Sequence, residues 1–512
     1  PSIQFGSRCW SFEEVRAAVA RTARVLAGKG VRPGDRVGVV CVNHPSTIIV
    51  FHALAHLGAI MVPGNPEFGV SELSYILTRA EVCGVIVSSS EFSKVHAATR
   101  PPAQLPWSLP NEPGEEQGDD AGAGAAQGLD TLSDLAARAS SEMPPGQADP
   151  ERSCIFIFTS GTTGFPKAVV HRQETVVRAA EAYVSRMHLQ PDDRVMCILP
   201  MFHINALFYS VMGSLAAGAL LILERRFSAS TFWRRVHATR TTCVNTIAAV
   251  NSILIKRPRT EFVAGHSLRK MFGAPYDEAT CRTFQQEFGV PVLIEGYGMS
   301  EVPSGMSNPF LGPHKLGSMG LPTPHPDPRI GVAEFKLVDE AGCPVPVGEA
   351  GELLVRTPLL MQEYYRDEDA TRQAVRDGWF VTGDLARRDA DGYYWFVGRK
   401  KDIIRRRGEN ISGAELDRVV GSHPHVLEAA AIAVPSELGE DEILVAVVAR
   451  PGCVPNALDI ASWSRERLAV SKLPRYVAFL DALPKTPTHR VAKYLLRQDP
   501  SLLARATDLS RT

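Results

Sequence analysis

Hydrophobic positions in the first hundred residues alternate between two spacings. Residues 11–30, SFEEVRAAVARTARVLAGKG, place apolar side chains at helical spacing and end on glycines that suit a C-cap. A short run rich in β-branched residues follows, and the same order of helix and strand returns in residues 44–66 and 71–89. This alternation predicts an α/β fold with a mainly parallel, covered sheet.

Residues 101–150 interrupt this order. The stretch PPAQLPWSLPNEPGEEQGDDAGAGAAQG consists mostly of Pro, Gly, Ala and acidic residues. Such a composition buries too little apolar surface to offset the chain entropy lost on folding. We therefore predict a flexible surface insertion without chemistry of its own, with a short helix within residues 129–139.

The alternating pattern resumes at SCIFIF and continues to about Val397, where a basic stretch begins. Six of the nine residues 399–407 are Lys or Arg. Beyond this stretch, helical and extended patterns mix in a unit of ordinary domain size. The sequence predicts a large N-terminal domain, residues 1–398, and a separate small α+β domain, residues 403–512.

Composition narrows the possible functions. Of the 512 residues, 45% are hydrophobic and 22% charged, and the formal net charge of −1 argues against a nucleic-acid-binding protein. We find neither an apolar run of the roughly 20 residues that a membrane span needs nor a secretory signal. The nine cysteines show no zinc-site spacing and indicate a reducing compartment. We expect a cytoplasmic protein with no membrane span.

The segment FTSGTTGFPK, residues 158–167, carries the strongest chemical signal and directly continues an apolar strand. Two glycines let the backbone approach an anion, hydroxyls can donate to phosphate oxygens, and a lysine adds positive charge. A polar turn between strands would explain some of these residues but not their combination. The spacing is not that of a Walker A loop. We predict that a phosphate binds to Thr159, Ser160, Gly161, Thr162, Thr163, Gly164 and Lys167.

This segment resembles the phosphate-binding signature of the adenylate-forming superfamily of acyl-CoA synthetases, peptide-synthetase adenylation domains and luciferases. Three further segments resemble its YGxTE, GWxxTGD and GRxKD…GENIS motifs in the same order: YGMSE at 297–301, GWFVTGD at 378–384, and GRKKD at 398–402 with GENIS at 408–412. The resemblance covers nearly the whole chain outside the insertion. PMFHINAL, residues 200–207, and GENIS look most similar to CoA ligases of the crotonobetaine/carnitine type.

The resemblance implies a multi-sheet α/β domain followed by a hinge, residues 399–402, and a mobile small domain. Lys401 matches the hinge position about which the small domain rotates between half-reactions. A basic run could instead form a nucleic-acid or membrane patch. Its place at the expected domain boundary favours the hinge.

The resemblance also implies the roles of single residues. Glu301 would hold Mg²⁺ against the phosphates of ATP, Asp384 and Arg399 would bind the ribose, and Tyr297 would stack on adenine. The alternative for Glu301 is a solvated loop carboxylate, and for Asp384 and Arg399 it is an N-cap or a surface ion pair. For Tyr297 it is a ring buried in the core. The implied nucleotide site further includes Gly273, Ala274, Pro275, Gly296, Gly298, Met299 and Ser300.

The acid substrate is expected in a separate pocket. His203 resembles the residue beside the channel for the acid and the nucleophile, although a histidine among apolar neighbours can simply be a core residue. The pocket would be lined by His203, Ala248, Val250 and Gly296, with Gly273, Ala274 and Pro275 nearby, although plain packing explains such small residues almost as well.

The C-terminal motif departs from the family. The superfamily has PKTxxGK, whose lysine reaches the carboxylate and α-phosphate, whereas this chain reads PKTPTHRVAK. Arg490 stands in the place of the lysine, and arginine keeps the charge but is planar and bulkier. Lys493, about one helical turn later, is the other candidate. A third alternative is that neither residue acts and that other groups support the adenylation step.

Together these residues predict an ATP-dependent enzyme that joins a small acid to AMP, releases pyrophosphate and passes the acid to an acceptor. Lys167, His203, Glu301 and either Arg490 or Lys493 would be the catalytic residues. Coenzyme A is the expected acceptor, and ATP and Mg²⁺ are required. One alternative is a diazotase that adenylates nitrite and transfers it to an aromatic amine, and another is an inactive binding protein that senses a nucleotide or acyl group. The sequence does not identify the acid or the oligomeric state.

Overall fold

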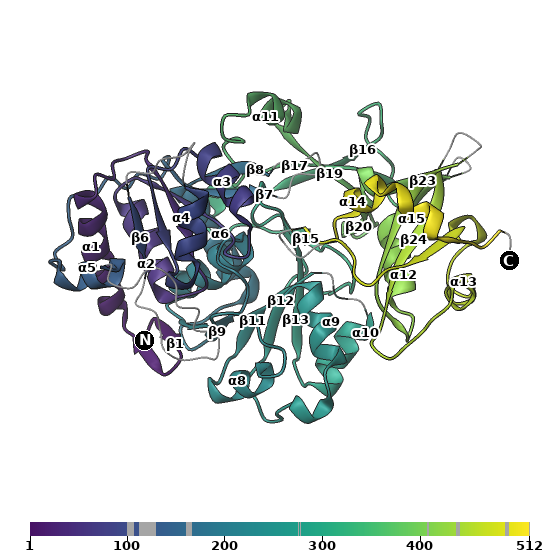
Figure 1. The fold of residues 1–512 in the computed structure, drawn as a ribbon, viewed down its shortest axis with the longest axis horizontal. Coiled ribbons are helices and arrows are strands. Elements are labelled where there is room, and N and C mark those ends of the chain that lie inside the picture. The colour runs from purple at the N-terminus through teal and green to yellow at the C-terminus, as the bar shows by residue number, and fades with distance from the viewer. Residues whose placement is uncertain are drawn as a thin grey trace. The chain divides into compact units, whose positions relative to one another are not determined.

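The computed structural model describes residues 1–99, 107–111, 130–159, 166–274, 276, 278–406, 409–436, 441–486 and 491–510. The chain forms two compact units (Figure 1). The first unit contains Pro1–Gly161, Phe165–Glu334 and Arg356–Gly378. The second contains Phe335–Val355 and Trp379–Thr512.

A six-stranded sheet in the first unit has the order β6-β5-β3-β4-β7-β8. The strands from β6 to β7 are parallel, and β8 is antiparallel to β7. Their bounds are β3 Arg36–Val40, β4 Ile60–Pro63, β5 Gly84–Val87, β6 Ser108–Pro110, β7 Ser153–Thr159 and β8 Lys167–Arg172. The helices between them are α1 Phe12–Gly28, α2 Pro45–His56, α3 Val70–Arg79, α4 Phe92–Ala98 and α5 Leu132–Arg138.

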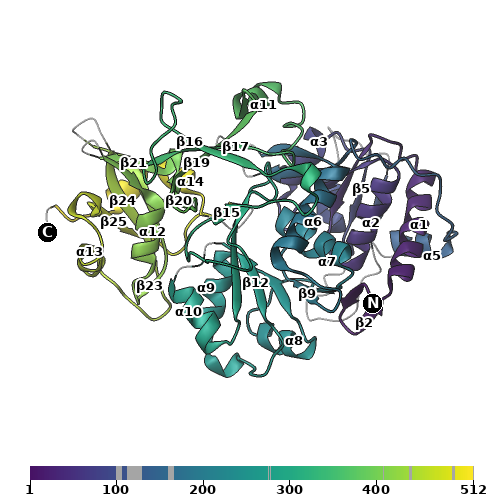
Figure 2. The same ribbon diagram turned by 180° about the vertical axis from the view of Figure 1, so that it is seen from behind.

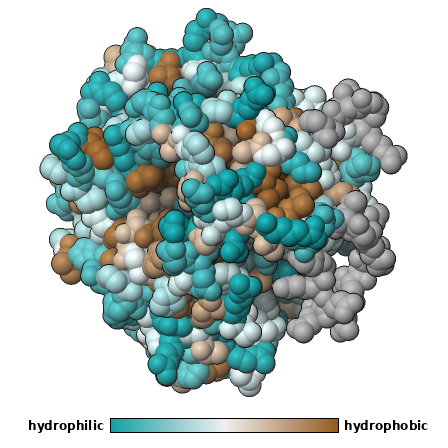
Figure 3. All heavy atoms as spheres, turned by 90° about the vertical axis from the view of Figure 1, so that its left-hand side faces the viewer, coloured by the Kyte–Doolittle hydropathy of each residue, from teal (hydrophilic) through white to brown (hydrophobic). Residues whose placement is uncertain are grey.

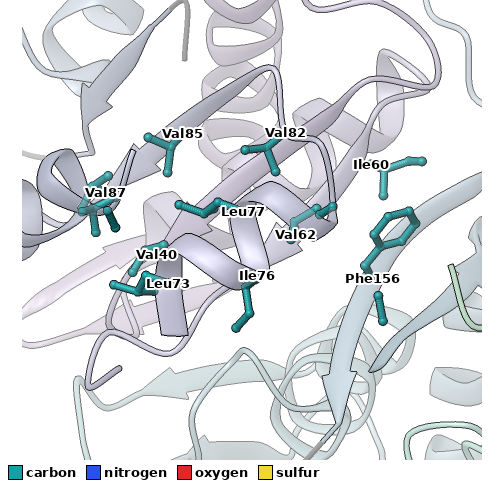
Figure 4. Packing of buried hydrophobic residues seen from close by; sticks show 14 of the residues in the cluster. Val40, Ile60, Val62, Leu73, Ile76, Leu77, Val82, Val85, Val87 and Phe156 are labelled. Atoms are coloured by element: carbon teal, nitrogen blue, oxygen red, sulfur yellow. The ribbon is translucent and has the colours of Figure 1, made fainter. Parts of the chain in front are cut away.

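Apolar side chains of α3 pack on one face of this sheet. Leu73, Ile76 and Leu77 contact a cluster of strand residues that includes Val62 and Phe156 (Figure 4). In β5 the consecutive residues Val85, Ile86 and Val87 are all fully buried. Because neighbouring side chains of a strand point to opposite faces, both faces of the sheet are covered. This confirms the α/β fold predicted from the alternating pattern.

The second sheet of the first unit has nine strands in the order β15-β14-β13-β12-β11-β9-β10-β1-β2. Its central strands are parallel, and helices α8, α9 and α10 lie beside it in both views (Figures 1 and 2). The strands are β1 Ile3–Phe5, β2 Arg8–Trp10, β9 Arg194–Cys197, β10 Leu220–Leu223, β11 Cys243–Asn245, β12 Lys270–Gly273, β13 Val292–Tyr297, β14 Met306–Ser307 and β15 Leu321–Pro322. The helices are α6 Gln173–Met187, α7 Met212–Ala217, α8 Phe232–Ala238, α9 Ala248–Lys256 and α10 Glu278–Arg282.

Four of the five strands of the next sheet belong mainly to the second unit: β16 Glu334–Val338, β17 Ala350–Arg356, β19 Trp379–Arg388 and β20 Tyr394–Arg399. The fifth strand is β18 Val375–Arg376. A β-ribbon of β21 Ile403–Arg406 and β22 Glu409–Ser412 follows. The last sheet has the order β23-β24-β25-β26, with the bounds Val426–Pro435, Asp441–Ala449, Tyr476–Phe479 and Thr507–Asp508.

Helices cover both faces of this last sheet. Buried residues of α12 Gly413–Gly421 and α13 Ala457–Arg465 pack on one face. Buried residues of α14 Lys493–Gln498 and α15 Pro500–Arg505 pack on the other. The mixed pattern read from residues 403–512 therefore folds as an α+β layer structure.

Part of the segment predicted to be a surface insertion belongs to the fold. Residues 108–110 form β6 at the edge of the six-stranded sheet, and Asn111, which is fully buried, donates its backbone N–H to the carbonyl of Val87. Helix α5 matches the short helix expected there. Sequence pattern missed β6 because its three residues, SLP, are too few to show a period. Residues 100–106 and 112–129 lie outside the described part.

The surface in Figure 3 is mainly hydrophilic, and its hydrophobic side chains lie in small separate groups. Among the described residues, every helix is too short or too polar to cross a bilayer.

Candidate active site

The strand pair β7–β8 fixes both ends of the predicted phosphate loop. Thr159 ends β7 and lies opposite Lys167, which begins β8. The Pro166 carbonyl, next to Lys167, accepts a hydrogen bond from the hydroxyl of Tyr75 at 3.3 Å. Antiparallel pairing thus holds the two loop ends side by side. Ser160, Gly161, Thr162, Thr163 and Gly164 lie outside the described residues, and their role stays a prediction.

The side chain of Lys167 lies over an aromatic ring. Its ammonium nitrogen is 4.9 Å from the centre of the Tyr364 ring, a cation–π distance. Within the described residues the Lys167 ammonium forms no ion pair. Its charge therefore remains available to an anion held by the adjoining loop.

Glu301 lies in the loop after β13 and contacts the same tyrosine. Its Oε1 accepts a hydrogen bond of 2.7 Å from the Tyr364 hydroxyl, and its carbonyl accepts one of 2.9 Å from Met361 N–H. Burial and the Glu301 carboxylate raise the pKa of Tyr364 above its ordinary value, so the phenol stays protonated and donates. In the described part of the chain, no donor contacts the second carboxylate oxygen, Oε2.

A buried histidine supports this loop from β8. His171 Nε2 donates to the carbonyl of Ser300 at 2.7 Å, because a carbonyl can only accept. Burial lowers the pKa of His171 to about 4, although the bond to Ser300 acts in the opposite direction. The ring is therefore neutral near pH 7 and holds the backbone next to Glu301 without adding charge.

This arrangement suits Mg²⁺ bound together with a nucleotide. Across the described ranges, no three His, Cys, Asp or Glu side chains gather into a metal site. Mg²⁺ typically uses one or two carboxylates plus substrate phosphates and water rather than a cage of protein ligands. One carboxylate with an unbonded oxygen, near a lysine at a phosphate loop, fits that requirement.

The predicted nucleotide residues on β12 and β13 lie on neighbouring strands. A Cβ on Gly273 would approach the Tyr276 hydroxyl to 2.9 Å, and one on Gly296 would approach the Phe272 ring to 2.7 Å. Close packing therefore accounts for both glycines without a ligand. Tyr297, Met299 and Ser300 are half-buried, whereas Gly298 and Ala274 are exposed. Pro275 lies outside the described residues.

In the second unit, Asp384 and Arg399 are cross-strand partners on β19 and β20. Arg399 Nε lies 2.8 Å from Asp384 Oδ1, and the Asp384 side chain is only 1% exposed. Gly383, with φ of 69°, provides the left-handed turn before Asp384, and the Thr382 hydroxyl accepts the Asp384 N–H at 3.0 Å. The two predicted ribose ligands thus form one joined ion pair.

The predicted hinge residue Lys401 lies in the short 3₁₀ turn Lys400–Asp402. Its neighbours are anchored: Lys400 contacts Glu352 at 2.8 Å, and Asp402 contacts Arg497 at 2.5 Å. Burial, with the nearby guanidinium groups, lowers the pKa of Lys401, while Asp402 acts against this. Its hinge role stays a prediction.

Of the two candidate C-terminal cations, the described residues include only Lys493. Lys493 begins α14, and its ammonium lies 2.6 Å from Asp417 Oδ2. Asp417 Oδ1 in turn accepts the Ala431 N–H at 2.6 Å. Lys493 therefore balances the negative charge of Asp417, whose carboxylate joins α12 to β23. Arg490 lies outside the described residues.

The remaining predicted pocket residues come from two segments. His203 is half-buried, its ring lies edge-on to Phe202, and its backbone bonds to Pro200 and Leu207. Ala248 begins α9 and is exposed, while Val250 is buried. Their part in an acid pocket stays a prediction.

Sequence reasoning missed Tyr364 and His171. Tyr364 lies in QEYYRD, where no spacing or glycine marks it, and His171 looks like an ordinary residue of a buried strand. Each can be recognised only from a contact in the folded structure. Tyr364 contacts Glu301, which is 63 residues away in the sequence, and His171 contacts Ser300, which is 129 residues away.

Comparison with known proteins adds independent information. The family model described as AMP-binding enzyme matches residues 1–365, and the model for the C-terminal domain of these enzymes matches residues 415–490. The sulfoacetate–CoA ligase of Cupriavidus necator is 31% identical, covering 92% of this chain and 89% of its own. The crotonobetaine/carnitine–CoA ligase of Salmonella typhi is 29% identical, covering 96% and 93%.

The fold also matches a solved structure. The anthranilate CoA ligase AuaEII, solved in complex with anthranoyl-AMP, superposes with a TM-score of 0.87 and 25% identity. The match covers 98% of this chain and 94% of that protein.

Proposed function

Because this chain belongs to the AMP-binding enzyme family and is an ATP-dependent, AMP-forming ligase, we propose that it joins a small carboxylic acid to AMP and transfers the acyl group to coenzyme A. The family membership agrees with the resemblance inferred from the four motifs. Relatives named for acid–CoA ligase activity, and one solved with an acyl-AMP, support the two half-reactions.

The observation that carries the proposal is the meeting of Lys167 and Glu301 at Tyr364. The two residues belong to separate motifs, yet both contact one tyrosine. Lys167 would contact the phosphates next to its loop. Glu301 would hold Mg²⁺, which neutralises phosphate charge when bound.

In the first half-reaction an acid oxygen attacks the α-phosphorus, and pyrophosphate leaves. Positioning and charge neutralisation supply most of the rate in such phosphate chemistry. Asp384, held by Arg399, would accept hydrogen bonds from the ribose hydroxyls. In the second half-reaction the thiol of coenzyme A attacks the acyl carbon, and AMP leaves with the electrons of the broken C–O bond.

The decisive experiment measures pyrophosphate release from ATP with a panel of aryl, alkyl and sulfonated carboxylic acids, each with and without coenzyme A. We expect at least one acid to stimulate release and coenzyme A to yield AMP and a thioester. Nitrite with an arylamine tests the diazotase alternative, which no structural observation favours. Nucleotide binding without pyrophosphate release for every acid would contradict the proposal and indicate a binding protein.

We expect Arg490 rather than Lys493 to act in adenylation, because Lys493 is already paired with Asp417. Arg490→Ala should slow ATP–pyrophosphate exchange by about 10²-fold and leave thioester formation from added acyl-AMP nearly unchanged. Lys493→Met should instead lower the free energy of unfolding by about 1–3 kcal/mol, since the half-buried carboxylate of Asp417 loses its partner. Exchange assays and thermal melts of both variants check this. A Lys493→Met protein with wild-type stability and no exchange would reverse the assignment.

A further inference from the structure

We infer that Tyr364 is a positioning residue that sets the metal-binding carboxylate of Glu301 and the phosphate-binding ammonium of Lys167 relative to each other. This inference rests on the proposed function. It assigns a role to a residue that neither phosphate chemistry nor the sequence motifs require to touch the nucleotide.

The first support is how firmly the backbone around Tyr364 is attached to β8. Gln362 and Tyr365 donate their N–H groups to the carbonyls of Val170 and Ala168 at 2.9 and 2.8 Å. Val170 N–H donates in return to Glu363 at 3.0 Å. Residues 362–365 are thus bonded to β8, the strand that begins with Lys167, and Tyr364 forms an isolated antiparallel bridge with Val169.

The second support is the attachment of the same segment to the Glu301 loop. Met361 N–H donates to the Glu301 carbonyl, and the Tyr364 hydroxyl donates to the carboxylate, both within 2.9 Å. The Tyr364 N–H is itself held by the Thr371 hydroxyl at 3.0 Å. Glu301 is therefore held through both its backbone and its side chain, while Oε2 remains unbonded among the described residues.

The third support is that one side chain makes both contacts. The Tyr364 side chain is largely buried, its ring face lies near the Lys167 ammonium, and its hydroxyl contacts Glu301. A rigid ring with two torsion angles keeps the two charged groups at a defined separation.

Hydrogen-bond partners of metal ligands usually change metal affinity or activity by about 10–100-fold when removed. Tyr364→Phe keeps the ring and its cation–π contact but removes the bond to Glu301. We expect the Mg²⁺ concentration for half-maximal ATP–pyrophosphate exchange to rise about tenfold or more, with a smaller change in the KM for the acid.

The readout independent of turnover is Mn²⁺ binding in the presence of ATP, followed by electron paramagnetic resonance without any acid. Tyr364→Phe should weaken this binding about tenfold while its thermal unfolding stays close to that of wild type. Tyr364→Leu also removes the aromatic ring that contacts the Lys167 ammonium. It should therefore weaken Mn²⁺ binding more than Tyr364→Phe does. The matched control is Tyr365→Phe, which removes the neighbouring phenol bonded to Glu81 at 3.3 Å and should leave metal binding unchanged.

A double variant tests whether Tyr364 acts through Glu301. In the Glu301→Gln background, Tyr364→Phe should weaken metal binding little further, because the coupled partner is already altered. Wild-type metal binding in Tyr364→Phe, or equal losses in both backgrounds, would overturn the inference. A wild-type protein that releases no pyrophosphate with any acid would instead refute the proposed function, and the Mn²⁺ measurement would still stand.

Discussion

Replacing Glu301 with glutamine is expected to slow adenylate formation by about 10²–10³-fold. The amide oxygen can still accept the hydrogen bond from Tyr364, so the loop keeps its anchor. The side chain loses the negative charge that a hard divalent cation requires. ATP–pyrophosphate exchange measured across a Mg²⁺ titration should show both a lower maximum and a higher requirement for the metal.

Glu363 provides the control for this change. It is exposed and lies next to Tyr364 on the segment that bonds to β8. Glu363→Gln removes one negative charge from the same region, and it should leave the Mg²⁺ requirement unchanged. A Glu301→Gln enzyme with the wild-type metal requirement would show that another group binds the ion.

Asp384→Asn should raise the KM for ATP in the exchange reaction by about 10–100-fold. Hydrogen bonds to a charged acceptor contribute about 1.5–3 kcal/mol each, and asparagine, which keeps one acceptor oxygen, should lose about one of the two that a carboxylate facing a ribose accepts. The same change breaks the ion pair with Arg399. Because the Arg399 side chain is 35% exposed and can be solvated, the free energy of unfolding should fall by only about 1–3 kcal/mol.

The buried pair of Arg406 and Glu442 offers a matched control in the same unit. These side chains lie 2.8 Å apart, with 11% and 8% exposure. Glu442→Gln should lower stability at least as much as Asp384→Asn but leave the KM for ATP unchanged. If both variants changed the KM equally, the effect of Asp384 would be one of stability and not of ribose binding.

Several features could be predicted from the sequence because they depend on local order. The spacing of apolar residues in 11–30 and 44–66 led to α1 and to the pair α2 and β4, since helix and strand periods are properties of a few neighbouring residues. That Asp384 and Arg399 serve one ribose was expected only from the resemblance of their motifs, and the structure shows that one hairpin joins them. Strand β6 escaped prediction because three residues carry no period.

The sequence by itself determined the α/β and α+β organisation, the family and the candidate side chains at each motif. Tertiary structure alone decided which of these side chains meet: that Lys167 and Glu301 contact the same Tyr364, that His171 holds the Ser300 carbonyl, and that Lys493 is paired with Asp417. The reason is physical. Periodicity and turn chemistry act over a few residues, whereas these contacts join segments brought together only when strands pair and the chain packs around its cores.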